Sequence, residues 1–551
     1  MPIAEPTRRA LPLILIRGFG GLGVEDEKRI AYQGFNDGTV YPQKRGENYI
    51  YEGLILRYLK SHWRYFDATN VVGYYSSALN QPRDLALLLK NEEEEVREKF
   101  LQLEAKGFFS DDRVLVDPSM ALSLLKTVEK PHQSLWVFRY YDLNDRKFET
   151  YGKALVRLIE FIRELIPPIS GEKVKVNIIA HSMGGLIVRE VVQKVYPNRG
   201  ERASEHINKI VTLGTPHYGI SFQFIKHWIG DAADDLEHFN PEFQRNPENQ
   251  TSAVNFKKFF PCDRLLTVVG TNYRTYGPVV ASWLNRLASL AGEFGFNYNR
   301  SDGLVKQSYA QIPGAPRTFV HKCHGGVDSL VTSREAYEIA TRFFHGNARV
   351  RLFLEQAHIT RGKDFFGKSE FFFGVSIKPR RVDFELFHQS VEAENCYGPF
   401  NNDDLSDDLG DTLVIVDKAK KEGFPWAGNG RLIWEGYLDT SRVLADPSIT
   451  PKDIVLRFDF YVGERDLLGV GFSDNVIFRK QYYVRALLPY QQEKLQLTLH
   501  TGEDFENPNA STPMQKRADG WHFEVQGTGF TAALRIEIDE VPEDGPPANY
   551  S

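Results

Sequence analysis

Residues 174–195 constrain the fold of this chain more than any other segment. An uninterrupted apolar run from Val174 to Ala180 leads directly into the turn His181 to Gly185. An apolar stripe at helical spacing follows the turn, from Ile187 to Val195, and ends before Pro197. A short continuous apolar run is typical of a strand buried on both faces of a parallel sheet. The segment therefore predicts a buried strand, a sharp turn and a helix.

Strands and helices alternate through the first 345 residues. Apolar runs predict buried strands at Leu11 to Ile16, Ser134 to Tyr141, Val174 to Ala180, Ile210 to Leu213 and Leu265 to Val269. A helix is predicted from Tyr151 to Leu165, where Pro167 and Pro168 stop it. A last helix is predicted from Thr332, which has capping-box spacing to Glu335. This alternation predicts the α/β class with a doubly wound, mostly parallel sheet.

The hydrophobic period changes from helical to two beyond Asn347. Apolar and polar residues alternate over Val350 to Leu354, Val382 to Leu386, Leu456 to Phe460, Leu495 to Leu499 and Leu534 to Ile538. Several short, half-buried strands with little helix between them predict an all-β antiparallel sandwich. We therefore predict a first domain at 1–346, a β-sandwich domain at 347–541 and a polar, Pro-rich tail at 542–551.

Composition limits the partners of the chain. At 551 residues it is too long for one ordinary hydrophobic core. The net charge of −6 is spread without a basic block, so nucleic acid is not an expected partner. Three widely spaced cysteines indicate neither a disulfide framework nor a zinc site. No run reaches the roughly 18 apolar residues of a membrane span, and the run ending at Ile16 is too short for a signal peptide. We expect a soluble protein, cytoplasmic or exported without a recognisable signal peptide.

Ser182 is the candidate nucleophile. A serine hydroxyl reacts only when a base removes its proton, and it must project from the backbone so that base and substrate can both reach it. A strained strand-to-helix turn provides that projection and requires small residues two positions away on either side, which here are Ala180 and Gly184. The pattern also fits a helix capped by Ser182, but the strand before it and the helix after it favour the nucleophile.

Two backbone N–H groups are expected to bind the oxyanion of a tetrahedral intermediate. One is that of Met183, at the helix start. The second is expected in the loop from Arg17 to Gly21, where Phe19 is the natural donor. A phosphate-cradling glycine loop is the alternative, but the segment has neither the dinucleotide spacing nor a Walker lysine.

Asp302 and a histidine after it are the candidates for the acid and the base. An α/β-hydrolase carries its triad in the chain order Ser, Asp, His, and Asp302 lies on an Asp-Gly turn downstream of the strand that ends at Val269. His321 and His324 are both candidate bases. We favour His324, which precedes two loop glycines, whereas His321 lies nearer the apolar end of a strand.

These segments resemble the lipase and serine esterase branch of the α/β-hydrolase superfamily, over about residues 11–345. The loop at Arg17 resembles the His-Gly-Phe-Gly-Gly oxyanion loop, residues 180–185 the nucleophile elbow, residues 211–217 the lipase strand after it, and residues 301–305 the acid segment. The resemblance implies the triad Ser182, Asp302 and His324 with donors at Phe19 and Met183. Ala180 replaces the first elbow glycine, a small-residue option that related lipases also use. Arg17 replaces the usual loop histidine, which leaves the hydrogen-bond support of the oxyanion loop open.

Two insertions interrupt the pattern, at about 83–130 and 216–299. The first holds the charge run Glu92 to Glu95, expected on a solvated helix face. The second holds apolar residues at helical spacing between Val280 and Phe294, expected as a lid over an acyl pocket or as a core helix. In the second domain, the aspartates between Asp403 and Asp411 are expected in a solvated loop rather than a calcium site.

The sequence thus predicts cleavage of carboxylic esters through an acyl-enzyme intermediate, without a cofactor. Acyl transfer, or hydrolysis of a thioester or amide, would use the same triad. A catalytically inactive binding protein with this fold is the alternative of another class. Three roles are possible for the β-sandwich: it could bind a surface, bind a partner protein or shield the catalytic cleft.

Overall fold

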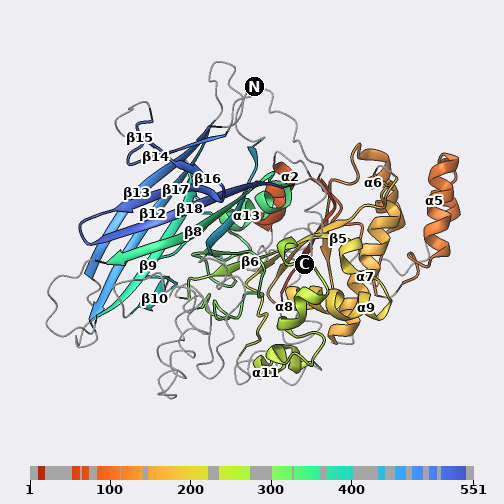
Figure 1. The fold of residues 1–551 in the computed structure, drawn as a ribbon. Coiled ribbons are helices and arrows are strands. Elements are labelled where there is room, and N and C mark those ends of the chain that lie inside the picture. The colour runs from red at the N-terminus through yellow and green to blue at the C-terminus, as the bar shows by residue number, and fades with distance from the viewer. Residues whose placement is uncertain are drawn as a thin grey trace, which may run out of the picture.

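The computed structural model describes residues 10–18, 52–61, 65–72, 84–111, 113–140, 147–169, 171–220, 235–273, 301–325, 328–359, 369–380, 382–393, 395–400, 432–440, 453–466, 475–487, 495–505 and 511–541. Within them, a parallel sheet with flanking helices precedes two antiparallel sheets, as the sequence predicts. Figure 1 shows the two parts side by side, with the parallel sheet and its helices in red to green and the antiparallel strands in green to blue.

Seven strands form the parallel sheet in the order β2-β3-β1-β4-β5-β6-β7. Their bounds are Leu13–Ile16 (β1), Phe66–Asp67 (β2), Ser134–Phe138 (β3), Val176–His181 (β4), Ile207–Leu213 (β5), Leu265–Gly270 (β6) and Arg317–Val320 (β7). All neighbouring pairs are parallel. Every residue of β1 and β4 is buried, which explains why these strands read as continuous apolar runs.

Helices surround this sheet. They span Glu52–Lys60 (α2), Leu85–Leu88 (α4), Glu94–Ala105 (α5), Pro118–Thr127 (α6), Phe148–Leu165 (α7), Met183–Glu190 (α8), Tyr196–Asn198 (α9), Pro241–Arg245 (α11) and Arg334–His345 (α13), and a π-helical turn, Val191–Val195 (η2), joins α8 to α9. The helix predicted from Thr332 begins at Arg334 instead, because Ser333 is its cap and accepts a hydrogen bond from the Ala336 amide at 3.0 Å. Among the described residues, no helix is long and apolar enough to cross a membrane.

The first insertion forms α4, α5 and α6, at the side of the parallel sheet away from the antiparallel strands (Figure 1). Glu93, Glu94 and Glu95 are exposed as expected. Glu92 differs, because its carboxylate bonds the Lys126 ammonium on α6 at 2.9 Å and its side chain is only partly exposed. The charge run therefore also links two helices of the insertion.

Two antiparallel sheets form the second part, in the orders β10-β9-β12-β13-β14-β15 and β11-β8-β18-β17-β16. Their bounds are Ala348–Ile359 (β8), Ser369–Pro379 (β9), Tyr397–Phe400 (β10), Leu432–Leu438 (β11), Asp453–Asp466 (β12), Asn475–Leu487 (β13), Gln496–His500 (β14), Ser511–Pro513 (β15), Gln515–Arg517 (β16), Gly520–Gln526 (β17) and Phe530–Glu540 (β18). Alternate residues of β8 and β18 are buried, which is the pattern of strands with one face on a core. The chain passes from α13 to β8 at residues 346–347, and we propose the domain boundary there.

The strand predicted at Val382 to Leu386 is absent, because this segment follows the edge of β7 without regular pairing. The His388 amide donates to the Phe319 carbonyl at 3.0 Å, and the Thr318 hydroxyl donates to the Leu386 carbonyl. Phe387 is fully buried against Phe319, with 5.4 Å between ring centroids. The segment also bonds β9, because the Ile377 amide donates to the Phe387 carbonyl and the Leu386 amide donates to the Ile377 carbonyl, both at 2.8 Å. The period-two pattern thus reflects burial between β7 and β9 rather than a regular strand.

Candidate active site

Ser182 lies at the sharp turn between β4 and α8. Its φ of 52° and ψ of −125° make it the only non-glycine residue with a positive φ in the described part of the chain. Such a conformation costs on the order of 1–3 kcal/mol and persists only where the surroundings impose it. Here β4 lies between β1 and β5, and the Ser182 amide donates to the Leu213 carbonyl of β5 at 2.9 Å. The sheet therefore holds the strained residue in place.

The glycines after the serine are required by space. A Cβ on Gly184 would lie 2.7 Å from the Arg17 carbonyl oxygen, and one on Gly185 would lie 2.1 Å from the Thr215 hydroxyl. Both distances are far below van der Waals contact. The small residues expected around the serine thus have a physical cause, which is the close approach of β1 and the loop after β5.

Ser182, His324 and Asp302 form one chain of hydrogen bonds. His324 Nε2 lies 2.9 Å from Ser182 Oγ, and His324 Nδ1 lies 2.8 Å from Asp302 Oδ2. All three residues are buried, at 4%, 2% and 1% exposure. The fold therefore places His324 within hydrogen-bonding distance of both Ser182 and Asp302, which lie 142 and 22 positions before it in the sequence.

The turn around Asp302 fixes its carboxylate. Oδ1 accepts hydrogen bonds from the amides of Leu304 and Val305, at 3.0 and 2.8 Å, which leaves Oδ2 directed at His324. The His324 amide in turn donates to the Asp302 carbonyl at 2.9 Å. Gly214 leaves room for this pair, because a Cβ there would lie 2.8 Å from Asp302 Oδ2.

His321, the other candidate base, lies elsewhere. Its Nδ1 is 3.2 Å from the Thr271 hydroxyl and its ring faces His388 at 5.2 Å between centroids. Burial, followed by the neighbouring His388, lowers the pKa of His321. His321 is thus part of the contact between the two halves of the chain, and His324 is the histidine beside Ser182.

His181 is a residue of this site to which the sequence assigned no role. Its Nε2 donates to the backbone carbonyl of His324 at 2.9 Å, and the two rings lie 4.8 Å apart. Burial, the neighbouring His324 and Arg17 lower the pKa of His181 well below its ordinary value, which keeps the ring neutral. A neutral imidazole carries one N–H, and the His324 carbonyl requires it on Nε2. His181 therefore holds the loop that carries His324.

For the ester hydrolysis that the sequence predicts, replacing His181 with alanine is expected to lower kcat on the order of 10- to 100-fold with little change in KM. The His324 carbonyl loses its donor, and small misplacements of a catalytic group have effects of this size. Steady-state kinetics on a soluble ester measures both constants. His181→Gln, which keeps a donor, should recover part of the loss, and the exposed His358→Ala is the control. Equal kcat in all variants would contradict the positioning role.

The oxyanion loop is described only at its start. Arg17 is buried, and the Tyr140 hydroxyl lies 3.0 Å from the Arg17 carbonyl and 2.9 Å from the Gly18 carbonyl. A Cβ on Gly18 would lie 2.6 Å from the Ser182 Cβ, so the loop passes directly against the serine. Phe19, the predicted second donor, lies outside the described residues, whereas the Met183 amide is at the first residue of α8.

Two further predictions concern segments that the structure does not describe. The helix of the second insertion, between Val280 and Phe294, and the aspartate loop at 403–411 both lie outside the described residues. Their roles as a lid and as a solvated loop stay predictions.

One group of possible metal ligands occurs among the described residues, in the antiparallel sheets. Glu355, Asp519 and His522 have ligand atoms within 4.8 Å of one another. His522 bonds Glu355 through Nδ1 at 2.9 Å and Asp519 through Nε2 at 3.0 Å, and Arg535 Nε lies 3.3 Å from Glu355. Both ring nitrogens are engaged and a guanidinium already balances the carboxylates, so this group is an ion-pair network.

Comparisons with known proteins show one family similarity, in the first part of the chain. The family model described as "PGAP1-like alpha/beta domain" matches residues 80–256, which include β3, β4, Ser182 and β5. A search among curated proteins finds no match.

Solved structures similar to this chain include a lipase and an esterase with low identity. They include the mature form of the Bacillus licheniformis lipase BlEst2 (12% identity, TM-score 0.28, 60% of this chain and 91% of that chain). They also include its propeptide form (11%, TM-score 0.32, 90% and 97%) and the metagenomic carboxyl esterase MGS0156 (12%, TM-score 0.24, 35% and 55%). TM-scores this low do not establish a shared fold, which rests instead on the strand order.

The parallel sheet, the strained serine between β4 and α8, and the family match agree with the resemblance seen in the motifs. The second part of the chain lies beyond the matched residues. The N-terminal part of this chain therefore has an α/β-hydrolase fold, and its residues 80–256 match the PGAP1-like alpha/beta domain.

Proposed function

We propose that this protein is a serine hydrolase that cleaves carboxylic esters through an acyl-enzyme intermediate. The observation that carries the proposal is the continuous hydrogen-bond chain from Ser182 Oγ through His324 to Asp302 Oδ2. A triad is recognised by the geometry of its nucleophile, base and orienting carboxylate rather than by sequence position, and this hydrogen-bond chain supports the proposed one. In this proposal Ser182 is the nucleophile, His324 is the general base and Asp302 orients His324.

In the first half of the reaction, His324 Nε2 takes the proton from Ser182 Oγ as the oxygen attacks the ester carbonyl carbon. Asp302 Oδ2 accepts the hydrogen bond from Nδ1 and stabilises the imidazolium that forms. The imidazolium then gives its proton to the departing alkoxide, which leaves as an alcohol. In the second half, His324 Nε2 takes a proton from water as the water attacks the acyl carbonyl carbon. The bond between that carbon and Ser182 Oγ then breaks, the imidazolium returns its proton to Oγ, and the acyl group leaves as a carboxylic acid.

The negative charge on the carbonyl oxygen needs fixed donors. The Met183 amide at the N-terminus of α8 is one proposed donor, where the helix dipole also favours an anion. Phe19 is the proposed second donor, and each such donor contributes on the order of 3 kcal/mol in the transition state. The Tyr140 hydroxyl, which bonds the carbonyls just before Phe19, supports the start of this loop.

Ester substrates with apolar acyl chains are proposed from the lipase resemblance. The same machinery permits acyl transfer to an alcohol and hydrolysis of thioesters or amides. A binding protein without turnover is disfavoured because His324 Nε2 lies at hydrogen-bonding distance from Ser182 Oγ, where it can remove the hydroxyl proton.

A fluorophosphonate probe is expected to label the protein at Ser182 and nowhere else. The probe reacts with a serine only where a base activates it, and mass spectrometry of the labelled peptide identifies the residue. Hydrolysis of p-nitrophenyl esters of increasing chain length then tests the substrate class. Absence of labelling on folded protein would exclude an activated serine, and label on another serine would exclude Ser182.

A further inference from the structure

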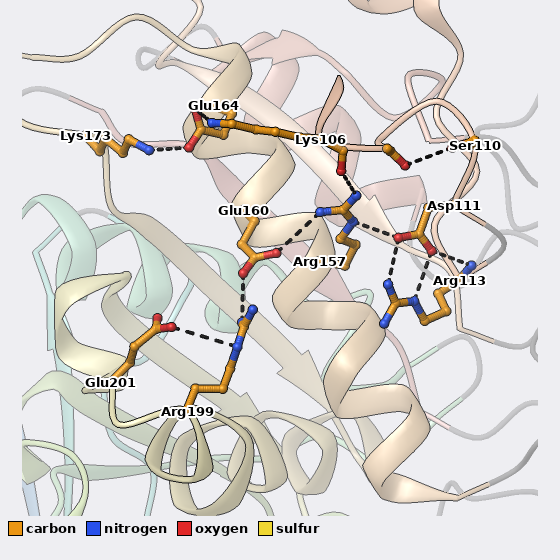
Figure 2. Close-up of polar contacts among 11 residues, drawn as sticks. Lys106, Ser110, Asp111, Arg113, Arg157, Glu160, Glu164, Lys173, Arg199 and Glu201 are labelled. Carbon is orange, nitrogen blue, oxygen red and sulfur yellow. Dashed lines mark hydrogen bonds and ion pairs between the residues drawn. The ribbon is translucent and has the colours of Figure 1, made fainter. Parts of the chain in front are cut away.

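Arg189 is a buried arginine on α8, seven residues after Ser182 and only 3% exposed. Arginines nearer the surface of this part of the chain pair with carboxylates, as Figure 2 shows for Arg157, whose Nε lies 2.7 Å from Asp111. Arg189 differs, because in the described part of the chain its guanidinium bonds four neutral oxygens and no carboxylate. A buried charge is tolerated only where its hydrogen bonds are satisfied, so these four bonds indicate its role.

The guanidinium of Arg189 joins its own helix to two other segments. Its Nε donates to the Gln193 side-chain oxygen at 3.0 Å, and its Nη1 donates to the His217 carbonyl at 2.8 Å. Its Nη2 donates to the Gln244 side-chain oxygen at 2.7 Å and to the Thr251 carbonyl. Burial lowers the pKa of Arg189 to about 9, so the group is still a cation at pH 7. One cation therefore ties α8 to the loop after β5 and to residues 244–251.

The loop after β5 lies against the proposed acid and base. A Cβ on Gly214 would lie 2.8 Å from Asp302 Oδ2 and 3.2 Å from His324 Nδ1, the two atoms that a hydrogen bond joins. The next residue, Thr215, packs on α8, where a Cβ on Gly185 would collide with its hydroxyl. These contacts place the loop between α8 and the hydrogen bond from His324 to Asp302.

His217 fixes the far end of this loop. It is fully buried, and its Nε2 lies 3.0 Å from the Thr212 hydroxyl on β5. Its amide donates to the Thr215 carbonyl at 2.8 Å, which closes a tight turn. Burial, followed by the charge of Arg189, lowers the pKa of His217 well below its ordinary value, so the ring is neutral. The bond from Arg189 to the His217 carbonyl therefore holds a turn that ends three residues after Gly214.

We propose that Arg189 is a positioning residue of the catalytic site, which holds the loop after β5 against the Asp302–His324 pair. The inference rests on the proposed function, since the triad reaction gives this pair its role. A guanidinium suits the place because its rigid fork of five donors reaches several oxygens in fixed directions, whereas an ammonium is a point charge. Without it, the buried carbonyls of His217 and Thr251 lose a donor. The loop can then move away from the pair, and Asp302 orients His324 less well.

Arg189→Ala and Arg189→Lys are expected to lower kcat for hydrolysis of a p-nitrophenyl ester on the order of 10- to 100-fold with little change in KM, because misplacement of a catalytic group slows the chemical step. Circular dichroism and thermal melting measure the folded fraction of each variant. Arg189→Lys keeps a cation and covers the case in which the alanine variant does not fold.

Recovery by added guanidinium ion separates positioning from stability. The alanine variant has a cavity lined by the oxygens that Arg189 bonded, and millimolar guanidinium chloride should raise its kcat several-fold. The lysine variant, whose side chain occupies that space, should not respond. A role in stability alone would give the opposite result, because guanidinium weakens folded proteins. Arg202→Ala is the matched control, since Arg202 is 80% exposed and pairs with Glu205 on the surface, and it should keep its kcat and show no recovery.

The outcomes distinguish this inference from the function on which it rests. A folded wild-type protein that hydrolyses no ester would overturn both. An active wild type with unchanged kcat in the Arg189 variants would overturn the inference alone. A loss of kcat that only follows the loss of folded protein, without recovery by guanidinium, would also overturn it. A lower kcat at an unchanged folded fraction, restored in part by guanidinium, supports the positioning role.

Discussion

Ser182→Ala is expected to lower kcat for ester hydrolysis by a factor on the order of 10⁴ to 10⁶. The alanine removes the hydroxyl that lies 2.9 Å from His324 Nε2 and that is the proposed nucleophile. Residual turnover would come from substrate binding and the oxyanion donors, which retain a modest acceleration over water. Initial rates on a p-nitrophenyl ester, with active sites counted by fluorophosphonate titration of the wild type, measure the loss.

Two matched comparisons make this test specific. Ser123→Ala changes an exposed serine on α6 and should leave kcat unchanged. His324→Ala should cost about as much as Ser182→Ala, because members of a triad act as a unit and their effects do not add. His321→Ala, which removes a ring beside Thr271 and His388, should cost far less. A large loss in His321→Ala and a small one in His324→Ala would reverse the assignment of the base.

Local sequence predicts the serine turn well, because every requirement of the turn lies within a few residues of Ser182. The strand before it, the helix after it and the small residues at 180 and 184 are all neighbours in the chain. Asp302 and His324 could be proposed only from chain order and resemblance. Their mutual distances depend on how β6 and β7 pair, which periodicity alone does not give.

The supporting residues could not be predicted, because their roles arise from contacts between distant segments. The carbonyl that His181 bonds belongs to a residue 143 positions later, and Tyr140 bonds carbonyls more than 120 positions before it. The sequence signal available was the position of His181 beside the serine and of Tyr140 at the end of a predicted strand. Neither signal distinguishes a structural contact from an ordinary buried residue.

The segment at 382–386 shows the converse error. Alternating apolar residues predicted a strand, since period two is also produced by any extended chain with one buried face. Here that face covers β7, and residues 386 and 388 bond the strand that leads to His324. The two halves of the chain are thus connected through the strand that precedes the proposed base.

Deleting all residues after 346 is expected to yield protein that aggregates and has no measurable ester hydrolysis. The deletion would expose the outer edge of β7, and open strand edges promote aggregation. It would also remove the ring of Phe387 from Phe319 and that of Tyr437 from Phe343, where the rings lie 5.4 and 5.0 Å apart. The strand that leads to the His324 loop would lose its support on one side. Soluble yield, circular dichroism and activity of the truncated chain measure the outcome.

A point variant in the full-length chain separates this dependence from a general failure to fold. Phe387→Ala should destabilise the protein by about 3–5 kcal/mol, as for other buried phenylalanines, and lower the temperature at which ester hydrolysis is lost. Phe523→Ala, on β17, removes a buried ring of the sandwich that does not touch β7. If the β-sandwich contributed only to the overall stability of the protein, both variants would lower the temperature at which activity is lost and leave kcat below that temperature unchanged. If it supports the histidine loop directly, Phe387→Ala should also lower kcat below the unfolding temperature, and Phe523→Ala should not.

A soluble, fully active chain ending at residue 346 would instead assign the sandwich to a role outside catalysis, such as contact with a surface or a partner.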